Sequence, residues 1–283
     1  MSKKAEVTCS FIGLGLIGGS IVKALRQAYP EMILKAYDKD RNGLSLARKD
    51  GVISEAYEAL TDSFFDCDYL FLCAPVSEND QFLGQIRQSL HADTILTDVG
   101  SVKQTTHAAI EKAGLSSVFI GGHPMAGREL SGFDATLADL FVGASLILTT
   151  PNPPKMLTDL ATQLGFAMVK CTTAENHDKM IAFTSQLAHI VSGAYIKSPS
   201  ALEHKGYSAG SFKDLTRVAY LNETMWTELF MDNRDYLSWE IGNIICELQK
   251  YKDAMDAQDS VRLKELLREG REMKERSNEN STC

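Results

Sequence analysis

Three glycines near the start of the chain have a spacing that can bind phosphate. The segment Phe11–Ser20 reads FIGLGLIGGS and places Gly13, Gly15 and Gly18 in a GxGxxG pattern between an apolar strand-like run and an apolar helix-like run. In such a unit the first glycine permits a tight turn, the second lets the backbone approach a pyrophosphate, and the third lets helix and strand pack closely. The helix N-terminus offers free amides and a positive dipole end to the anion. The pattern therefore predicts a dinucleotide site that comprises Gly13, Leu14, Gly15, Leu16, Ile17 and Gly18.

An acidic residue at the end of the next predicted strand indicates which dinucleotide is bound. Asp38 lies about 20 residues after Gly18, where a carboxylate accepts hydrogen bonds from the adenosine ribose hydroxyls and repels a 2′-phosphate. This residue favours NAD over NADP. Lys39 and Arg41 follow closely and could contact a phosphate, so NADP stays open as the alternative.

Two residues that could take part in proton transfer each follow an apolar strand-like run. They are Ser101 and His123, and a neutral imidazole is suited to take a proton near pH 7. Because the carboxyl ends of parallel strands meet at one edge of a sheet, both residues would face the same crevice as the glycine loop. The alternatives are a turn histidine beside Pro124 and, for Ser101, an N-cap of a helix over Lys103–Ala113.

The composition is that of an ordinary globular protein. The 283 residues, of which 44% are hydrophobic, suffice for one large or two moderate domains. A net charge of -8 without blocks of like charge argues against nucleic acid or a membrane surface as the partner. Six cysteines without a CxxC pair favour reduced thiols in a cytoplasmic protein over disulfides or a metal site. We find no targeting segment and no apolar run near the ~20 residues of a spanning helix.

The chain shows two kinds of hydrophobic pattern, which predict the elements that position these residues. Short apolar runs alternate with helix-length segments and predict a doubly wound, mostly parallel α/β sheet of the Rossmann type. The predicted strands are Val7–Ile12, Met32–Tyr37, Tyr69–Ala74, Thr94–Val99, Val118–Ile120, Ser145–Leu148 and Phe166–Val169. After Cys171 only helical patterns follow, at 174–198, 212–231, 232–251 and 258–276. We therefore predict a dinucleotide-binding domain over residues 1–171 and an all-helical domain over 172–283.

Four later segments, together with the glycine loop, resemble the prephenate dehydrogenase family. They read TDVGSVK at 97–103, GGHPMAGRE at 121–129, SQLAH at 185–189 and FKDLTRVA at 212–219. The resemblance is more specific than any one motif because the order and spacing of the segments agree. It implies NAD-dependent oxidative decarboxylation of prephenate to 4-hydroxyphenylpyruvate in tyrosine biosynthesis, and a homodimer that pairs through the helical domain.

The resemblance also implies roles for the polar residues. His123 would bond the ring hydroxyl and take its proton, and Ser101 would bond both that hydroxyl and the histidine. Arg217 would bind a substrate carboxylate through paired guanidinium donors, although an ion pair with Asp214 is the alternative. His189 would help to hold the substrate, and its alternative is a buried core histidine.

Several further positions match family residues, but for them a purely structural role is a stronger alternative than it is for the residues above. Glu129 and Lys213 fall where the family has a gating ion pair, but they could be solvated charges. Gly210 and Trp226 match positions that border the substrate side chain, and Trp226 could instead belong to the core or to a dimer interface. Arg128 could add an anion contact or point to solvent. The cofactor site would be completed by Ala74, Pro75 and Asp98.

One departure from the family pattern and three rival functions stay open. Gln186 and Ala188 stand where a histidine and a proline are common, which puts the local helix geometry in question. The nearest rival is an arogenate dehydrogenase, whose substrate carries an amino group in place of the keto group. A second rival is another two-domain hydroxyacid dehydrogenase, which would use Lys179. The third is an NAD-sensing module without turnover.

Overall fold

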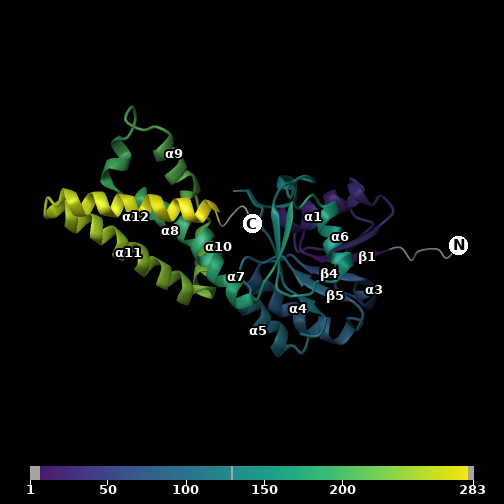
Figure 1. Cartoon of the computed structure of the whole chain (residues 1–283). Helices are drawn as coiled ribbons and strands as arrows, with labels where there is room; N and C mark the ends of the chain where they lie inside the picture. The colour runs from purple at the N-terminus through teal and green to yellow at the C-terminus, as the bar shows by residue number, and fades with distance from the viewer. Residues whose placement is uncertain (1–6, 129, 280–283) are drawn as a thin grey trace.

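The chain forms a strand-rich body followed by an elongated array of helices, seen in the computed structural model of Figure 1, which describes residues 7–128 and 130–279. Strands continue as far as β9, which ends at Cys171, and α7 begins at Ala174. All later regular elements among the described residues are helical. The predicted α/β fold class with a helical second part is confirmed.

A six-stranded parallel sheet forms the centre of the strand-rich body. Its strands stand in the order β3-β2-β1-β4-β5-β6, so the chain builds outward from β1 in one direction and then crosses to the other side. This reversal between β1 and β4 creates the crevice in which doubly wound sheets bind ligands. The strands are β1 (Thr8–Ile12), β2 (Ile33–Tyr37), β3 (Glu55–Tyr57), β4 (Tyr69–Leu72), β5 (Ile95–Asp98) and β6 (Phe119–Ile120). The connecting helices are α1 (Leu16–Ala28), α2 (Arg41–Lys49), α3 (Asp62–Phe65), α4 (Val76–Ser89) and α5 (Gln104–Lys112).

The last strands form a second, three-stranded sheet, which differs from the sequence prediction of one sheet. β7 (Gly122–Pro124) pairs antiparallel with β8 (Ser145–Leu148), and β8 pairs parallel with β9 (Met168–Cys171). Neither β7 nor β3 was predicted, because both are three residues long and β7 contains a glycine and a proline, which are depleted in strands. The short 3-10 helix η1 (Phe133–Ala135) and α6 (Lys155–Gln163) complete this part.

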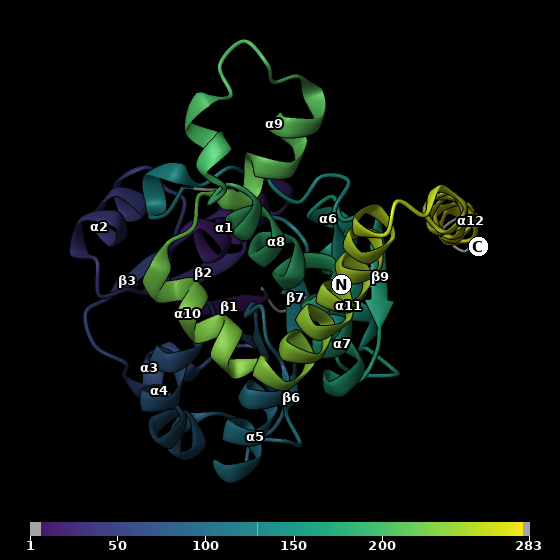
Figure 2. The same ribbon diagram turned by 90° about the vertical axis from the view of Figure 1, so that its left-hand side faces the viewer.

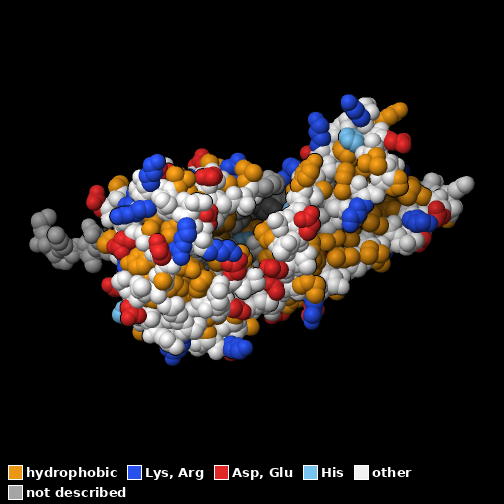
Figure 3. Space-filling view, turned by 180° about the vertical axis from the view of Figure 1, so that it is seen from behind, with side chains coloured by type: hydrophobic (Ala, Val, Ile, Leu, Met, Phe, Trp, Pro, Cys, Tyr) orange, Lys and Arg blue, Asp and Glu red, His pale blue; other side chains and the backbone are white. Residues whose placement is uncertain are grey.

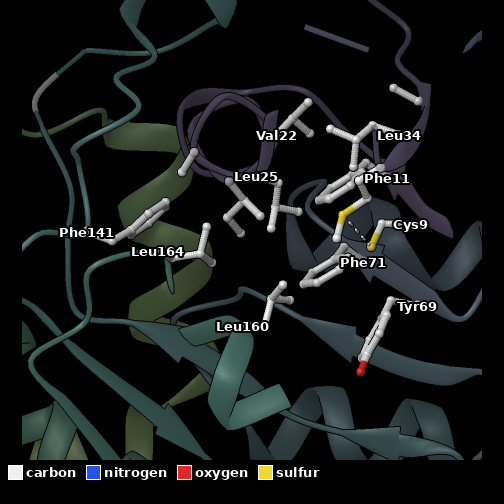
Figure 4. Close-up of a cluster of buried hydrophobic side chains, with 14 of the residues drawn as sticks. Cys9, Phe11, Val22, Leu25, Leu34, Tyr69, Phe71, Phe141, Leu160 and Leu164 are labelled. Atoms are coloured by element: carbon white, nitrogen blue, oxygen red, sulfur yellow. Dashed lines mark hydrogen bonds between the residues drawn. The ribbon is translucent and has the colours of Figure 1, made fainter. Parts of the chain in front are cut away.

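The buried side chains join the two sheets into one body. Phe11 of β1 and Phe71 of β4 stack with ring centroids 4.7 Å apart. In Figure 4 Val22 and Leu25 of α1 cover them from one side, and Leu160 of α6 approaches from the other. Burying a side chain of this size stabilises a fold by roughly 1.5–3 kcal/mol. A second cluster, with Phe64, Phe65, Ile86 and Leu96, covers the opposite face of the main sheet.

The helical part contains more breaks than the sequence pattern predicted. The helix expected over 174–198 consists of α7 (Ala174–Ile181), a π-helical stretch η2 (Ala182–Gln186) and α8 (Leu187–Tyr195). The helix expected over 212–231 is interrupted, because Tyr220–Asn222 leave helical geometry and the Asn222 side chain caps a new helix through the backbone N–H of Met225. The remaining elements are η3 (Pro199–Glu203), α9 (Gly210–Thr216), η4 (Arg217–Ala219), α10 (Glu223–Asp232), α11 (Arg234–Asp256) and α12 (Ser260–Glu279).

The helical part lies against the C-terminal edge of the main sheet. In Figure 2, α10 crosses in front of the strands, and the α9 segment projects away from them. Direct bonds connect the two parts: the Ser77 hydroxyl donates to Glu228 at 3.0 Å, and the backbone N–H groups of Lys103 and Gln104 donate to Asp178 at 2.8 Å. The second half therefore contacts the main sheet's C-terminal edge at the starts of α4 and α5.

Large apolar side chains remain exposed on the long helices. Trp239, Ile245 and Leu248 of α11 are each at least 60% exposed, and Figure 3 shows hydrophobic side chains gathered over this part of the molecule. Exposed apolar surface of this extent is typical of an interface. In the described part of the chain no helix is long and apolar enough to span a membrane.

Candidate active site

The glycine loop has the geometry that its sequence predicts. Gly13 has φ +102°, and a Cβ atom there would lie 2.7 Å from backbone atoms of Cys73 and Ala74. A Cβ on Gly18 would lie 2.8 Å from the Cys73 Cβ, so both glycines permit close contact with the end of β4. Gly15 has no atom within 4 Å of its Cβ position and caps α1 without any side-chain bond. The α1 N-terminus thus faces open space, as a bound pyrophosphate requires.

Asp38 lies beside this loop and stabilises it through hydrogen bonds. One carboxylate oxygen accepts the Leu14 N–H at 2.5 Å, and the other accepts the Asp40 N–H at 2.7 Å. The neighbouring cations have partners of their own. Lys39 forms an ion pair with Glu78, and the Arg41 guanidinium donates to the Glu58 carbonyl at 2.7 Å. The two cations left open for a 2′-phosphate are therefore engaged with the protein.

The three remaining predicted cofactor residues have different environments. Ala74 and Pro75 lie between β4 and α4, at the edge that carries the glycine loop, and neither is fully buried. Asp98 ends β5 and is only 1% exposed. Its carboxylate accepts the N–H groups of Gly100 and Gly122, each at 3.0 Å, and forms an ion pair with the buried Lys103. Both carboxylate oxygens of Asp98 therefore have donors within the protein, and its contact with a cofactor stays a prediction.

His123 lies in β7, buried at the junction of the two parts. Its Nδ1 lies 2.8 Å from His177 Nε2, and His177 Nδ1 lies 2.7 Å from Asp178 Oδ1. Burial, with the charge of Lys103 and the neighbouring His177, holds the pKa of His123 well below its usual value. Among the described residues the Nε2 atom of His123 has no hydrogen-bond partner, and the residue as a whole is only 9% exposed. The imidazole is thus kept neutral and has one nitrogen free.

Ser101 is half-buried on the loop between β5 and α5, but it does not make the bonds that were considered for it. No hydrogen bond joins its hydroxyl to His123 or to another described residue. The N-cap alternative is wrong, because α5 begins only at Gln104 and the Asp178 carboxylate accepts the N–H groups at its start. The Ser101 hydroxyl is therefore available to a ligand.

Three predicted substrate residues meet in the helical part. His189 of α8 donates its Nδ1–H to the Val218 carbonyl at 2.9 Å, which places it beside Arg217, the preceding residue of η4. The Trp226 ring contacts the His189 ring with centroids 4.0 Å apart. His189 is half-buried, so it is not the fully buried core histidine considered above.

The predicted cations of this region are exposed and form no ion pair with another described residue. Arg217 and Lys213 form no salt bridge within the described part of the chain, and the alternative pair between Arg217 and Asp214 is not formed. Arg128 is exposed and only reaches the Ala135 carbonyl at 3.4 Å. Gly210 begins α9 with open space at its Cβ position. Glu129, the predicted partner of Lys213, lies outside the described residues.

The irregular helix around Gln186 accords with the departure noted in the sequence. Gln186 ends the π-helical stretch, and its amide donates to the Leu229 carbonyl at 3.0 Å and accepts from Asn233 at 2.8 Å. Single π-helical turns are rare in proteins, and those that occur are often found at functional sites. This buried amide network ties α8 to the corner between α10 and α11.

Sequence reasoning did not single out His177 and Asp178. Both are on α7 and almost fully buried, and their partners lie 54 to 75 positions away in the chain. The available signal was a His-Asp pair within the amphipathic helix α7. Lys179, the residue of the hydroxyacid dehydrogenase alternative, is exposed and forms an ion pair with Glu175.

Family models match both parts of the chain. Residues 21–165 match the prephenate dehydrogenase nucleotide-binding domain, and residues 173–269 match the prephenate dehydrogenase dimerization domain. Among curated proteins, a cyclohexadienyl dehydrogenase of Zymomonas mobilis is 31% identical over 92% of this chain and 92% of its own length. A prephenate dehydrogenase of Lactococcus lactis is 30% identical over 93% of this chain and 75% of its own length.

Solved structures extend the similarity to the whole fold. A prephenate dehydrogenase of Aquifex aeolicus, solved with hydroxyphenyl propionate and NAD+, has a TM-score of 0.84 and 27% identity and covers 98% of this chain and 99% of its own. A Synechocystis arogenate dehydrogenase has a TM-score of 0.79 and 28% identity, with 96% and 100% covered.

Proposed function

The chain belongs to the prephenate dehydrogenase family, and we propose that it converts prephenate to 4-hydroxyphenylpyruvate and carbon dioxide as a step of tyrosine biosynthesis. It is an oxidoreductase with NAD as cofactor. In the proposed reaction the ring carbon that carries the hydroxyl loses a hydride and the ring carboxylate leaves as carbon dioxide. Because the ring becomes aromatic, the reaction is strongly downhill. The protein must therefore mainly orient the reactants and hold their charges.

The glycine loop and Asp38 would hold the cofactor. The open space at Gly15 and the uncapped start of α1 fit a pyrophosphate, and the Asp38 carboxylate at the end of β2 fits the adenosine ribose. Leu14, Leu16, Ile17, Ala74, Pro75 and Asp98 complete the proposed site. NAD, when bound, supplies the hydride acceptor.

The observation that carries the proposal is the buried, neutral His123 at the junction of the two parts, whose Nε2 bonds to no other described residue. A neutral imidazole there can take the proton of the substrate hydroxyl, and the unbonded hydroxyl of Ser101 can orient that group. The catalytic residues that we propose are therefore His123 and Ser101.

The helical part would bind the substrate carboxylates. Arg217 offers a planar pair of donors that no other described residue engages in an ion pair, and His189 is fixed by the carbonyl of Val218, the residue after Arg217. Lys213 adds positive charge to an otherwise acidic protein. We place Gly210 and Trp226 around the substrate side chain, in the domain 172–283 that follows the dinucleotide-binding domain 1–171. Glu129 of the dinucleotide-binding domain would pair with Lys213 to gate the site.

The match to a dimerization domain supports a homodimer. We propose that the exposed apolar side chains of α11 pair two copies, since a surface of this kind is unfavourable in water. Nothing in the charge pattern favours a nucleic-acid partner.

The relatives named above favour arogenate as the second candidate substrate, because they include a cyclohexadienyl and an arogenate dehydrogenase. The test is to supply the purified chain with NAD and either substrate, and to measure NADH formation and carbon dioxide release. We expect kcat/KM for prephenate to exceed that for arogenate by at least about tenfold, which corresponds to about 1.4 kcal/mol. A preference for arogenate would overturn the choice of substrate.

The variant His123→Asn tests the proposed base. We expect turnover to fall by at least about 100-fold while NAD binding is retained, since the glycine loop is untouched. Unchanged turnover would contradict the role of His123.

A further inference from the structure

Three side chains form one hydrogen-bonded row that crosses the junction of the two parts of the chain. His123 comes from β7, while His177 and Asp178 come from α7, and the two bonds of the row measure 2.8 and 2.7 Å. His123 is 9% exposed and the other two are at most 1% exposed. A row of buried polar groups is stable only when each donor faces an acceptor. The hydrogen bonds of this row must therefore all point in the same direction along it.

The direction of the bonds follows from the Asp178 end. Asp178 Oδ1 accepts the backbone N–H of Lys103 and Oδ2 accepts that of Gln104, both at 2.8 Å, so both carboxylate oxygens act as hydrogen-bond acceptors. The facing nitrogen of His177, Nδ1, must therefore donate. In neutral His177 the opposite nitrogen, Nε2, is then an acceptor, and the facing Nδ1 of His123 must donate to it.

We propose that His177 and Asp178 are positioning residues that hold His123 with its proton on Nδ1 and its lone pair on Nε2. This inference deepens the proposed function, because it states which atom of His123 acts and what fixes it. The other nitrogen of His123 is the one without a partner among the described residues. The tautomer of the proposed base is thus fixed by the hydrogen bond that His123 Nδ1 makes to His177.

The proton balance of the proposed reaction explains why such a row is useful. As the hydride leaves the ring carbon, the substrate O–H bond breaks, the Nε2–H bond forms, and the electron pair of the O–H bond forms the C=O bond. When carbon dioxide leaves, the electron pair of the broken C–C bond enters the ring, and the oxygen becomes a phenolate that takes the proton back from Nε2. His123 is positively charged only between these two steps. The Asp178 carboxylate stabilises that charge through His177.

The surroundings of His123 make this stabilisation necessary. The groups that face it are His177 of α7 and Lys103, from the loop before α5, while Asp98 is paired with Lys103. Burial, Lys103 and His177 all lower the pKa of His123. An isolated imidazole here would resist protonation, and Asp178 is the one anion bonded into its row.

The experiment compares His177→Leu, which removes the acceptor, with His177→Gln, whose amide oxygen can still accept from His123 Nδ1. The matched control is His107→Leu, which also removes a partly buried imidazole and one hydrogen bond, to Thr149, without touching His123. The readouts are kcat, the KM for NAD and the pH profile. Nitrogen-15 NMR of labelled histidine reports the tautomer of His123 without any ligand.

We expect His177→Leu to lower kcat by about 100-fold or more with the KM for NAD unchanged, and to leave His123 in a mixture of tautomers. His177→Gln should restore most of kcat and the Nδ1–H form, and His107→Leu should behave like the wild type in both readouts. A wild-type kcat and a pure Nδ1–H form in His177→Leu would overturn the inference. If the wild type turns over neither prephenate nor arogenate, the proposed function fails, and the NMR measurement still decides the tautomer.

Discussion

The proposed cofactor side and the proposed substrate side of this molecule are built in different ways. On the cofactor side, Gly13, Gly18 and Asp38 make backbone contacts within one sheet, so the loop has little freedom. On the substrate side, Arg217 and Lys213 lie on short helical pieces, exposed and without ion pairs in the described chain. The fold itself fixes the first geometry. The second leaves unpaired charge that a dicarboxylate would neutralise, so it should matter for affinity more than for stability.

The largest effect should follow from Gly13→Val on the cofactor side. A branched side chain would have to adopt φ +102° with its Cβ 2.7 Å from backbone atoms of Cys73 and Ala74. We expect the free energy of unfolding to fall by about 4 kcal/mol, and NAD binding to be lost. Chemical denaturation and NAD titration measure the two effects.

The matched control is Gly15→Ala, whose added Cβ meets no atom within 4 Å. It should change the free energy of unfolding by less than about 1 kcal/mol while weakening NAD binding, because the methyl group enters the space proposed for the pyrophosphate. Equal destabilisation by the two substitutions would contradict the rigid loop described here.

A smaller effect, on affinity alone, is expected for Arg217→Leu on the substrate side. The KM for prephenate should rise by about 100-fold, or about 2.7 kcal/mol, because a pair of charge-assisted hydrogen bonds is lost. The melting temperature should stay within about 1 °C, because the side chain is exposed and forms no ion pair with another described residue. Arg234→Leu, which loses only a surface pair with Asp235, is the control. A large loss of melting temperature in Arg217→Leu would remove the contrast between the two sides.

The helical part also contains a buried amide network, formed by Gln186 and Asn233, that supports α8. The variant Gln186→Ala tests this network. The substitution leaves the Leu229 carbonyl without its donor and the Asn233 amide without one of its acceptors. We expect the free energy of unfolding to fall by about 2 kcal/mol. Gln163→Ala on α6, an exposed glutamine without a bond in the described structure, should cost much less. Similar losses in both variants would show that the amide network does not support α8.

The smallest effect concerns pH. Burial, Lys103 and His177 lower the pKa of His123, so the folded protein keeps it neutral at the ordinary histidine pKa of about 6.5. Between pH 8 and pH 6.5, kcat/KM should therefore fall by less than about twofold. The unfolded chain binds this proton more readily, so the contribution of His123 to stability is lost as the pH falls below that value. A pH profile with a midpoint at or above 6.5 would contradict the depressed pKa.

The backbone geometry of the glycine loop could be predicted from the sequence because its determinants are local. A GxGxxG segment between a strand and a helix requires the backbone geometry found at Gly13 and Gly18. The family pattern also identified His189, Trp226 and Arg217, which meet in the structure. In both cases the signal is a short segment of adjacent residues.

The missed features all depend on tertiary contacts. The strand that carries His123 contains a glycine and a proline and forms only because β8 pairs with it. Asp178 caps a helix that begins 74 positions earlier in the chain, so no local pattern could assign the cap to it in place of Ser101. The break at Tyr220–Asn222 is likewise hidden in a sequence with continuous helical spacing.

The carboxylate of Asp178 has a consequence for how the two domains can be recombined. It belongs to the helical part, yet it caps the N-terminus of α5 in the nucleotide-binding part and supports the proposed base on β7. A chimera that joins this nucleotide-binding domain to a foreign helical domain would have an uncapped α5 and an unsupported imidazole, unless the first helix of the new domain carried the same His-Asp pair at the same place. The boundary between the domains is therefore not a neutral place to cut. In exchange experiments the unit that must be transferred intact is the sheet together with α7.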